Sequence, residues 1–138
     1  MCRMFFAGLL LTAAAGCVVP PERVPLRPLP DDAAPLTYAD AVSRTRSLAS
    51  AANEAFYVNN WQDLEDAARG LDQTARFLAK ATEVPVRHKD TLVVEAGDLG
   101  KEAGKLLECA KARDVKLANE SLQRINLKVR ELRPENGK

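Results

Sequence analysis

The sequence is poor in the side chains that carry chemistry in proteins. Its 138 residues include one histidine, one tryptophan and two methionines, and aromatic residues make up 5% of the chain. Strands favour aromatic and β-branched residues, so this composition argues against a strand-rich fold. The formal net charge is only +1, which gives no overall field to attract nucleic acid or anionic lipid. We therefore expect no nucleic-acid partner.

Cysteine is also scarce, and three cysteines do not make a disulfide framework. Cys2 and Cys17 lie near the start, so only Cys109 falls in the part expected to fold. Cys109 follows Leu106 by three positions, at the edge of an apolar helical stripe, which favours a small buried side chain. The alternative is an exposed thiol that forms a dimer or a mixed disulfide in an oxidising compartment.

The start of the chain has the layout of a secretory signal. Arg3 precedes an apolar run from Met4 to Leu11, and small residues then lead to Cys17. The run is too short to remain as a membrane-spanning helix. We therefore expect residues 1–16 to be a signal peptide that is removed, which leaves equal numbers of basic and acidic side chains.

The end of this signal resembles the lipobox of bacterial lipoproteins. It reads Ala14-Ala15-Gly16-Cys17, with Ala14 where that family most often has Leu. The resemblance implies that the thiol of Cys17 receives a diacylglycerol, that the chain is cut before it, and that the new amine is acylated. The alternative is an ordinary secretory signal cut near Ala15, which leaves Cys17 as a free thiol.

Lipidation at Cys17 would determine the location of the protein. Two or three acyl chains anchor a domain stably in a bilayer. The residue after the cysteine is Val18 rather than Asp, which resembles the pattern of lipoproteins sent on to the outer membrane. The expected location is the cell envelope, with the chain lipid-anchored at the outer membrane and facing the periplasm.

A proline-rich segment follows the expected cleavage site. Six of the eight prolines lie between Val18 and Leu36, a density that blocks helix and favours extended polyproline II. We expect residues 17–36 to hold the lipidated cysteine and a linker that spaces a domain from the membrane, with a reach of up to about 60 Å. The alternative is a proline-rich ligand for the groove of a partner.

From Thr37 onward the apolar residues recur at the period of amphipathic helices. The pattern predicts helices over about 38–58 and 61–82, a third from between 85 and 90 to about 112, and a fourth over 115–132. Thr37, Asn60 and Asp114 are expected to cap helices, and Pro134 to end the last one. Short turns between such helices predict an all-α, antiparallel up-down-up-down four-helix bundle over residues 37–134, followed by a tail at 135–138.

Each predicted helix has an apolar stripe for the core. The stripes are Tyr38, Val42, Thr45, Leu48, Ala52 and Ala55; Trp61, Leu64, Ala68, Leu71, Ala75 and Leu78; Leu92, Ala96, Leu99, Ala103, Leu106 and Ala110; and Val115, Ala118, Leu122, Ile125, Val129 and Leu132. Gly97, Gly100 and Gly104 weaken the third helix by roughly 1 kcal/mol each relative to Ala. We expect a neighbouring helix to pack closely against these glycines.

The last helix resembles part of a known scaffold. Cytochrome c-prime bundles carry Cys-x-x-Cys-His near the end of their last helix, followed after two further residues by an aromatic residue and then Arg. In the corresponding run, Leu122 and Ile125 stand at the cysteine positions, Asn126 at the histidine, Val129 at the aromatic residue, and Arg130 at the Arg. Residues 37–133 are therefore similar to a cytochrome c-prime-like bundle that lacks the haem-attachment motif.

The same scarcity argues against cofactors, metals and catalysis. Without residues 1–16 the chain has no methionine, and its only histidine is His88, whereas haem held without covalent attachment usually needs such ligands. A metal site would have only Cys109 to add to His88, and di-iron and serine-hydrolase motifs are absent. We expect no cofactor, no metal site and no catalytic residue, with His88 in a solvated turn. The alternative is an enzyme that uses His88 as a general base.

These expectations leave an interaction role. The region of the last helix has a positive bias from Arg113, Lys116, Arg124, Lys128, Arg130 and Arg133. This bias fits either a solvated face or contact with an anionic envelope polymer such as lipopolysaccharide or peptidoglycan. We expect a membrane-anchored envelope lipoprotein with a structural or protein-interaction role. The alternative is a periplasmic ligand-binding or sensory module with a cavity between its helices.

Overall fold

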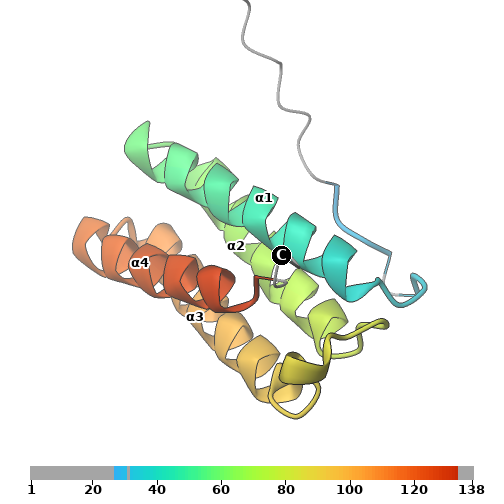
Figure 1. The fold of residues 1–138 in the computed structure, drawn as a ribbon. Helices are drawn as coiled ribbons and strands as arrows, with labels where there is room; N and C mark the ends of the chain where they lie inside the picture. Colours follow the sequence, from blue (N-terminus) through green and yellow to red (C-terminus); the bar gives the residue numbers. More distant parts are fainter. Residues whose placement is uncertain (1–26, 31, 134–138) are drawn as a thin grey trace, which may run out of the picture.

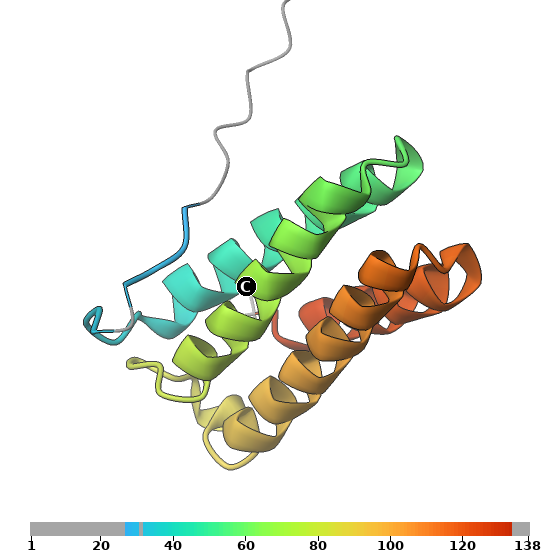
Figure 2. The same cartoon turned by 180° about the vertical axis from the view of Figure 1, so that it is seen from behind.

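A computed structural model describes residues 27–30 and 32–133 and has four α-helices (Figure 1). They are α1 (Tyr38–Tyr57), α2 (Trp61–Leu78), α3 (Leu92–Ala112) and α4 (Val115–Glu131). In Figures 1 and 2 the hairpin of α1 and α2 lies beside the hairpin of α3 and α4. The closest neighbours are α2 and α3, while α1 and α4 complete the ring. The predicted four-helix bundle is confirmed.

Three polar side chains begin the helices as predicted. The side chain of Thr37 accepts a hydrogen bond from the amide of Asp40 at 3.1 Å, and Asn60 accepts one from the amide of Asp63 at 3.2 Å. Asp114 accepts one from the amide of Leu117 at 2.9 Å. Each bond satisfies a backbone donor that has no partner inside its helix.

The connection between α2 and α3 differs from the prediction. α2 ends at Leu78 rather than near Thr82, and α3 begins at Leu92 rather than between 85 and 90. Thr82 instead pairs with the segment before α1: its amide donates to the carbonyl of Leu36 at 2.9 Å, and its carbonyl accepts from the amide of Tyr38 at 2.8 Å. This tertiary pairing competes with the helical bonds that the periodic pattern allowed.

A short 3-10 helix, η1 (Val86–His88), lies inside this connection. Pro85 precedes it with extended backbone, which is compatible with a new helical turn after the proline but not with one continuous helix. The amide of His88 donates to the carbonyl of Pro85 at 2.9 Å and closes the turn. The predicted single helix is therefore wrong at its start.

The predicted core stripes are confirmed with two exceptions. The apolar stripe residues of α1 and α3, and those of α2 from Leu64 onward, are buried. Trp61 is only half-buried and packs edge-to-face on Phe56, with ring centroids 6.3 Å apart. Val115 is 57% exposed, because it lies in the first turn of α4 at the end of the bundle. No helix in the described ranges is long and apolar enough to cross a membrane.

The described part of the proline-rich segment is bound to the bundle. The backbone of Leu29 forms two hydrogen bonds with the side-chain amide of Gln73 on α2, at 2.9 and 2.7 Å. The guanidinium of Arg44 on α1 donates to the carbonyl of Arg27. The expected linker over 17–36 therefore ends in a strap, residues 27–30 and 32–36, that belongs to the folded unit. The expected signal peptide and the lipidation site at Cys17 lie outside the described residues.

Candidate functional site

His88 is the first candidate, and the prediction that it lies in a solvated turn is wrong. Its side chain is buried, and the residue is 3% exposed. The ring stacks on Tyr38, with centroids 5.2 Å apart. Its Nδ1 atom lies 3.2 Å from a carboxylate oxygen of Glu95, and its Nε2 atom accepts a hydrogen bond from Arg87 at 2.9 Å. This network assigns the proton of a neutral ring to Nδ1, with Glu95 as its acceptor.

His88, Tyr38, Arg87 and Glu95 are called here the histidine cluster. Further hydrogen bonds tie it to the ends of three helices. Thr91 donates to the other carboxylate oxygen of Glu95 at 2.7 Å. The hydroxyl of Tyr38 on α1 donates to the carbonyl of Leu132 after α4, at 2.6 Å. Arg87 donates to the carbonyl of Glu131 at 3.3 Å. The cluster therefore joins the start of α1 and α3 to the end of α4.

The environment of Tyr38 holds its hydroxyl in the neutral form. Burial, and then the negative charge of Glu95, raise the pKa of Tyr38 to about 12, while Arg87 and Arg46 act in the opposite direction. A neutral hydroxyl keeps the proton that it donates to Leu132. Both nitrogens of His88 and the hydroxyl of Tyr38 already have partners inside the fold. The arrangement fits a structural clamp better than an open acid or base.

Asn126, which the sequence comparison placed at the histidine of a haem motif, takes part in a contact between two helices. Asn126 on α4 pairs with Asn53 on α1, and each side-chain amide donates to the other's oxygen, at 3.1 and 3.2 Å. Reciprocal amide bonds between two helices fix their register. Cys109 is half-buried and packs against the core. In the described part of the chain, no three His, Cys, Asp or Glu side chains gather to hold a metal ion.

The basic face of α4 is partly engaged by acids of α3. Arg124 lies 2.7 Å from Glu102, and Lys128 lies 3.5 Å from Asp98. Desolvation raises the pKa of Glu102, but hydrogen bonds from Lys105 and Arg124 outweigh it, so the pKa lies below its ordinary value. Glu102 therefore stays charged between the two helices. These pairs reduce the positive bias that the sequence showed for α4.

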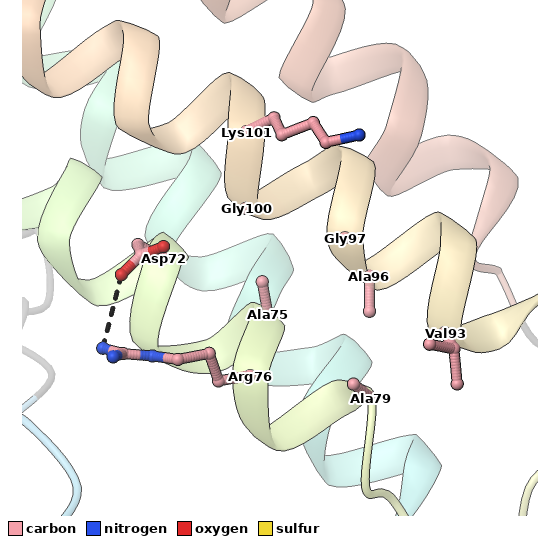
Figure 3. Close-up of a pocket in the computed structure, with 9 residues that line it drawn as sticks. All are labelled: Asp72, Ala75, Arg76, Ala79, Val93, Ala96, Gly97, Gly100 and Lys101. Atoms are coloured by element: carbon pink, nitrogen blue, oxygen red, sulfur yellow. Dashed lines mark ion pairs between the residues drawn. The ribbon is translucent and has the colours of Figure 1, made fainter.

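The second candidate is a groove on the outer face between α2 and α3 (Figure 3). It consists of two adjoining hollows of about 520 and 740 Å³ that share Asp72 and Arg76. The smaller hollow is lined by Ala75 and Ala79 of α2, and by Val93, Ala96, Gly97, Gly100 and Lys101 of α3. The larger is lined by Arg69, Gly70 and Gln73 of α2, by Gly104, Leu107 and Glu108 of α3, and by Pro28 of the strap.

The floor of the groove belongs to a second periodic stripe of α3, called here the outer seam. Its members are Val93, Gly97, Gly100, Gly104 and Leu107, each one position after a member of the buried stripe, called here the inner seam. The expected close packing against these glycines is found only at Gly100, where an added Cβ would lie 3.6 Å from that of Ala75. An added Cβ at Gly97 or Gly104 would meet nothing within 4 Å.

The glycines at these two positions therefore cost helix stability without a packing gain inside the described fold. Gly in a helix interior is less favourable than Ala by roughly 1 kcal/mol. Figure 3 shows Gly97 and Gly100 as bare ribbon, with Ala75 and Ala79 of α2 across from them. The α2–α3 groove is thus a long surface hollow whose floor has no side chains at its open positions.

Charged side chains lie along both walls of the groove. α2 contributes Arg69, Asp72 and Arg76, and α3 contributes Lys101 and Glu108. Each pairs with a neighbour on its own helix, as in Asp72 with Arg76 at 3.3 Å and Glu108 with Lys111 at 2.9 Å. Such exposed pairs contribute little free energy and exchange partners readily. The groove therefore has a partly apolar floor, made mostly of small residues, between walls that carry both signs of charge.

Comparison of the chain with protein-family models, with curated proteins and with solved structures gave no match.

Proposed function

We propose that this protein is a membrane-anchored envelope lipoprotein with a structural or protein-interaction role, and that it catalyses no reaction. The proposal of an anchor rests on the lipobox-like ending at Cys17. The observation that carries the non-catalytic role is the closed histidine cluster. Both ring nitrogens of His88 are engaged, by Arg87 and Glu95, and the residue is buried.

The strap supports a short tether. Because residues 27–30 and 32–36 lie on or beside the bundle, only residues 17–26 remain to span the distance to a lipid anchor. Ten residues reach about 31 Å at 3.1 Å each in an extended polyproline conformation. An anchored bundle would therefore work near the membrane surface rather than at the longer reach expected from the whole proline-rich segment.

The contact surface in this proposal is the outside of the bundle. Both hollows described above lie between α2 and α3. The interior of the bundle is a core of buried side chains from all four helices. These features favour contact with another macromolecule over enclosure of a small ligand. We therefore place the interaction role on the surface of the bundle and prefer it to the ligand-binding alternative.

The anchor is tested by fractionation of bacterial cells that express the full chain with and without Cys17→Ala. We expect the unchanged protein in the membrane fraction, labelled by radioactive palmitate, and the Cys17→Ala variant without label. Cys109→Ser is the matched control, since it removes a thiol from the folded part, and it should keep both label and location. Equal labelling of the Cys17→Ala variant would contradict the proposal.

The absence of catalysis is tested at the histidine cluster. His88→Gln keeps a side chain that donates and accepts hydrogen bonds but cannot act as a general base. If deletion of the gene gives a phenotype in its host, the His88→Gln protein should restore growth as fully as the unchanged protein. Failure of restoration by a variant that is folded and correctly located would favour the enzyme alternative.

A further inference from the structure

We propose that the α2–α3 groove is a self-association surface, on which a second copy of this chain packs about a two-fold axis that runs along the groove. The proposal goes beyond the envelope role above and does not depend on the lipid anchor. It rests on three features of the groove: its open glycine floor, the order of charges along its two walls, and the direction of the helices.

The floor is shaped for a closely packed neighbour. Gly97 and Gly104 leave space that no side chain of the described residues fills. Small residues at helical spacing let two helices approach closely, which increases their van der Waals contact. Val93 and Leu107 close the two ends of the outer seam with larger apolar side chains. A second helical surface laid along the groove would bury this seam.

The walls carry opposite charges at matching positions. Arg69 of α2 and Glu108 of α3 line the larger hollow, Lys101 of α3 lines the smaller one, and Asp72 and Arg76 of α2 line both. Ala79 and Val93 line the apolar end of the same smaller hollow. From the larger hollow to the smaller one, α2 therefore reads basic, acidic, basic, apolar, with Arg76 between Asp72 and Ala79, and α3 reads acidic, basic, apolar.

A two-fold axis along the groove places this pattern against itself. The rotation keeps positions along the groove and exchanges its walls, so α3 of the second copy faces α2 of the first. Glu108 then falls against Arg69 of the other copy, and Lys101 against Asp72. Each contact is repeated by symmetry, and Val93 meets Ala79. These two pairs and the apolar contact favour a second copy as the occupant, while Arg76 has only the glycine floor and Lys101 opposite it among the α3 residues that line the smaller hollow.

A two-fold axis that lies in the plane of the contact but runs perpendicular to the groove is disfavoured. It would lay α2 against α2 in the antiparallel sense, and Arg69 and Arg76, on either side of Asp72, would then face each other. Juxtaposed like charges oppose association. The parallel arrangement has a further consequence, because it leaves the starts of both bundles at the same end. This arrangement is compatible with two copies anchored in one membrane.

The charged side chains are free enough to form these contacts. Lys101 and Glu108 have side chains that are 76% and 73% exposed. Their present partners, Asp98 and Lys111, lie three positions away on the same helix. Exchange of such a pair for one between copies costs little free energy.

The test is sedimentation equilibrium of the full chain under reducing conditions, in a density-matched non-ionic detergent. We expect a reversible monomer–dimer equilibrium. Gly97→Leu should shift it to monomer, because the new side chain occupies the floor of the groove. Its matched control is Ala51→Leu, a similar substitution on the exposed face of α1, which should leave dimerisation unchanged. Thermal unfolding followed by circular dichroism checks that both variants fold.

Charge reversal decides between this dimer and another one. Glu108→Arg and Arg69→Glu should each weaken dimerisation about tenfold or more, because each places like charges opposite each other. The double variant restores opposite charges and should recover most of the affinity. A chain that remains monomeric over the accessible concentration range would overturn the proposal. A dimer that is insensitive to Gly97→Leu, or that is not recovered by the double reversal, would overturn it as well.

Discussion

The two seams of α3 have the same spacing but different fates. The inner seam reads Leu92, Ala96, Leu99, Ala103, Leu106 and Ala110, and all of these side chains are buried. The outer seam is displaced by one position and consists of two large residues with three glycines between them. Periodicity shows where a helix is able to pack, whereas side-chain size determines whether its own bundle fills the contact.

The difference has a physical origin in the neighbours of each seam. The leucines of the inner seam extend into a core to which all four helices contribute. The outer seam borders α2 and, at its Gly104–Leu107 end, Pro28 of the strap. Only Gly100 of its three glycines comes close to a side-chain carbon of α2, that of Ala75. The inner seam therefore stabilises the monomer, and the outer seam remains available for a contact outside it.

The largest predicted effect is a truncation in the inner seam. Leu99→Ala removes a fully buried side chain and should lower the free energy of unfolding by about 2–5 kcal/mol, measured by urea denaturation. Leu127→Ala is the matched control on α4, where the residue is 54% exposed, and should change stability by less than about 0.5 kcal/mol. Equal losses in the two variants would remove the distinction between core and surface on which the comparison rests.

A smaller loss is expected in the histidine cluster, which contacts the first turn of α3. Glu95→Ala removes the acceptor of His88 and Thr91, which leaves a buried imidazole donor without a partner. The expected loss in the free energy of unfolding is about 1–3 kcal/mol, again from urea denaturation. Glu108→Ala removes a carboxylate from the surface of the same helix and should cost far less. An unchanged free energy of unfolding in the Glu95→Ala variant would show that the histidine cluster is not a clamp.

Substitution in the outer seam should have the opposite sign. Gly97→Ala and Gly104→Ala should each raise the free energy of unfolding of the monomer by about 0.5–1 kcal/mol, because Ala favours helix and its Cβ meets no atom there. Denaturation at a concentration low enough to keep the chain monomeric measures this gain. The reverse change in the inner seam, Ala103→Gly, should destabilise. Loss of stability in Gly97→Ala would contradict an open groove floor.

The last prediction concerns the ionisation of Tyr38, which has no effect on stability at neutral pH and acts only at high pH. Its pKa is raised from 10.0 to about 12, so the folded state favours the protonated hydroxyl. The resulting stability is fully present below pH 10 and is lost as the pH rises from 10 towards 12. Denaturation at pH 9 and pH 11.5 measures the loss. Tyr38→Phe should lose less stability across this interval, and an unchanged pH dependence in that variant would assign the loss to other groups.

Much of the bundle follows from local patterns that a single helix contains. Thr37, Asn60 and Asp114 cap the helices as predicted, because the cap bond joins residues three positions apart. The buried stripes also follow from spacing within one helix. Local patterns did not predict where α2 ends, because the amide and carbonyl of Thr82 pair with the distant segment around Leu36.

The candidate sites depend on contacts between distant residues, and the sequence indicated them only in part. His88 is buried because η1 lays its ring on Tyr38, 50 positions earlier, and no spacing rule joins the two. A signal was present in Glu95, which lies at the start of α3 seven positions after His88. The glycines that form the groove floor were visible in the sequence, but only the position of α2 shows that two of them remain open.

The proposed role depends on Cys17 more than on any other residue, so the most direct test is mass spectrometry of the N-terminal peptide of the protein from bacterial membranes. We expect a tryptic peptide from Cys17 to Arg23 that carries a diacylglycerol on the thiol and an acyl chain on the amine. A peptide that begins at another residue, or that begins at Cys17 with an unmodified thiol, would contradict the proposed role.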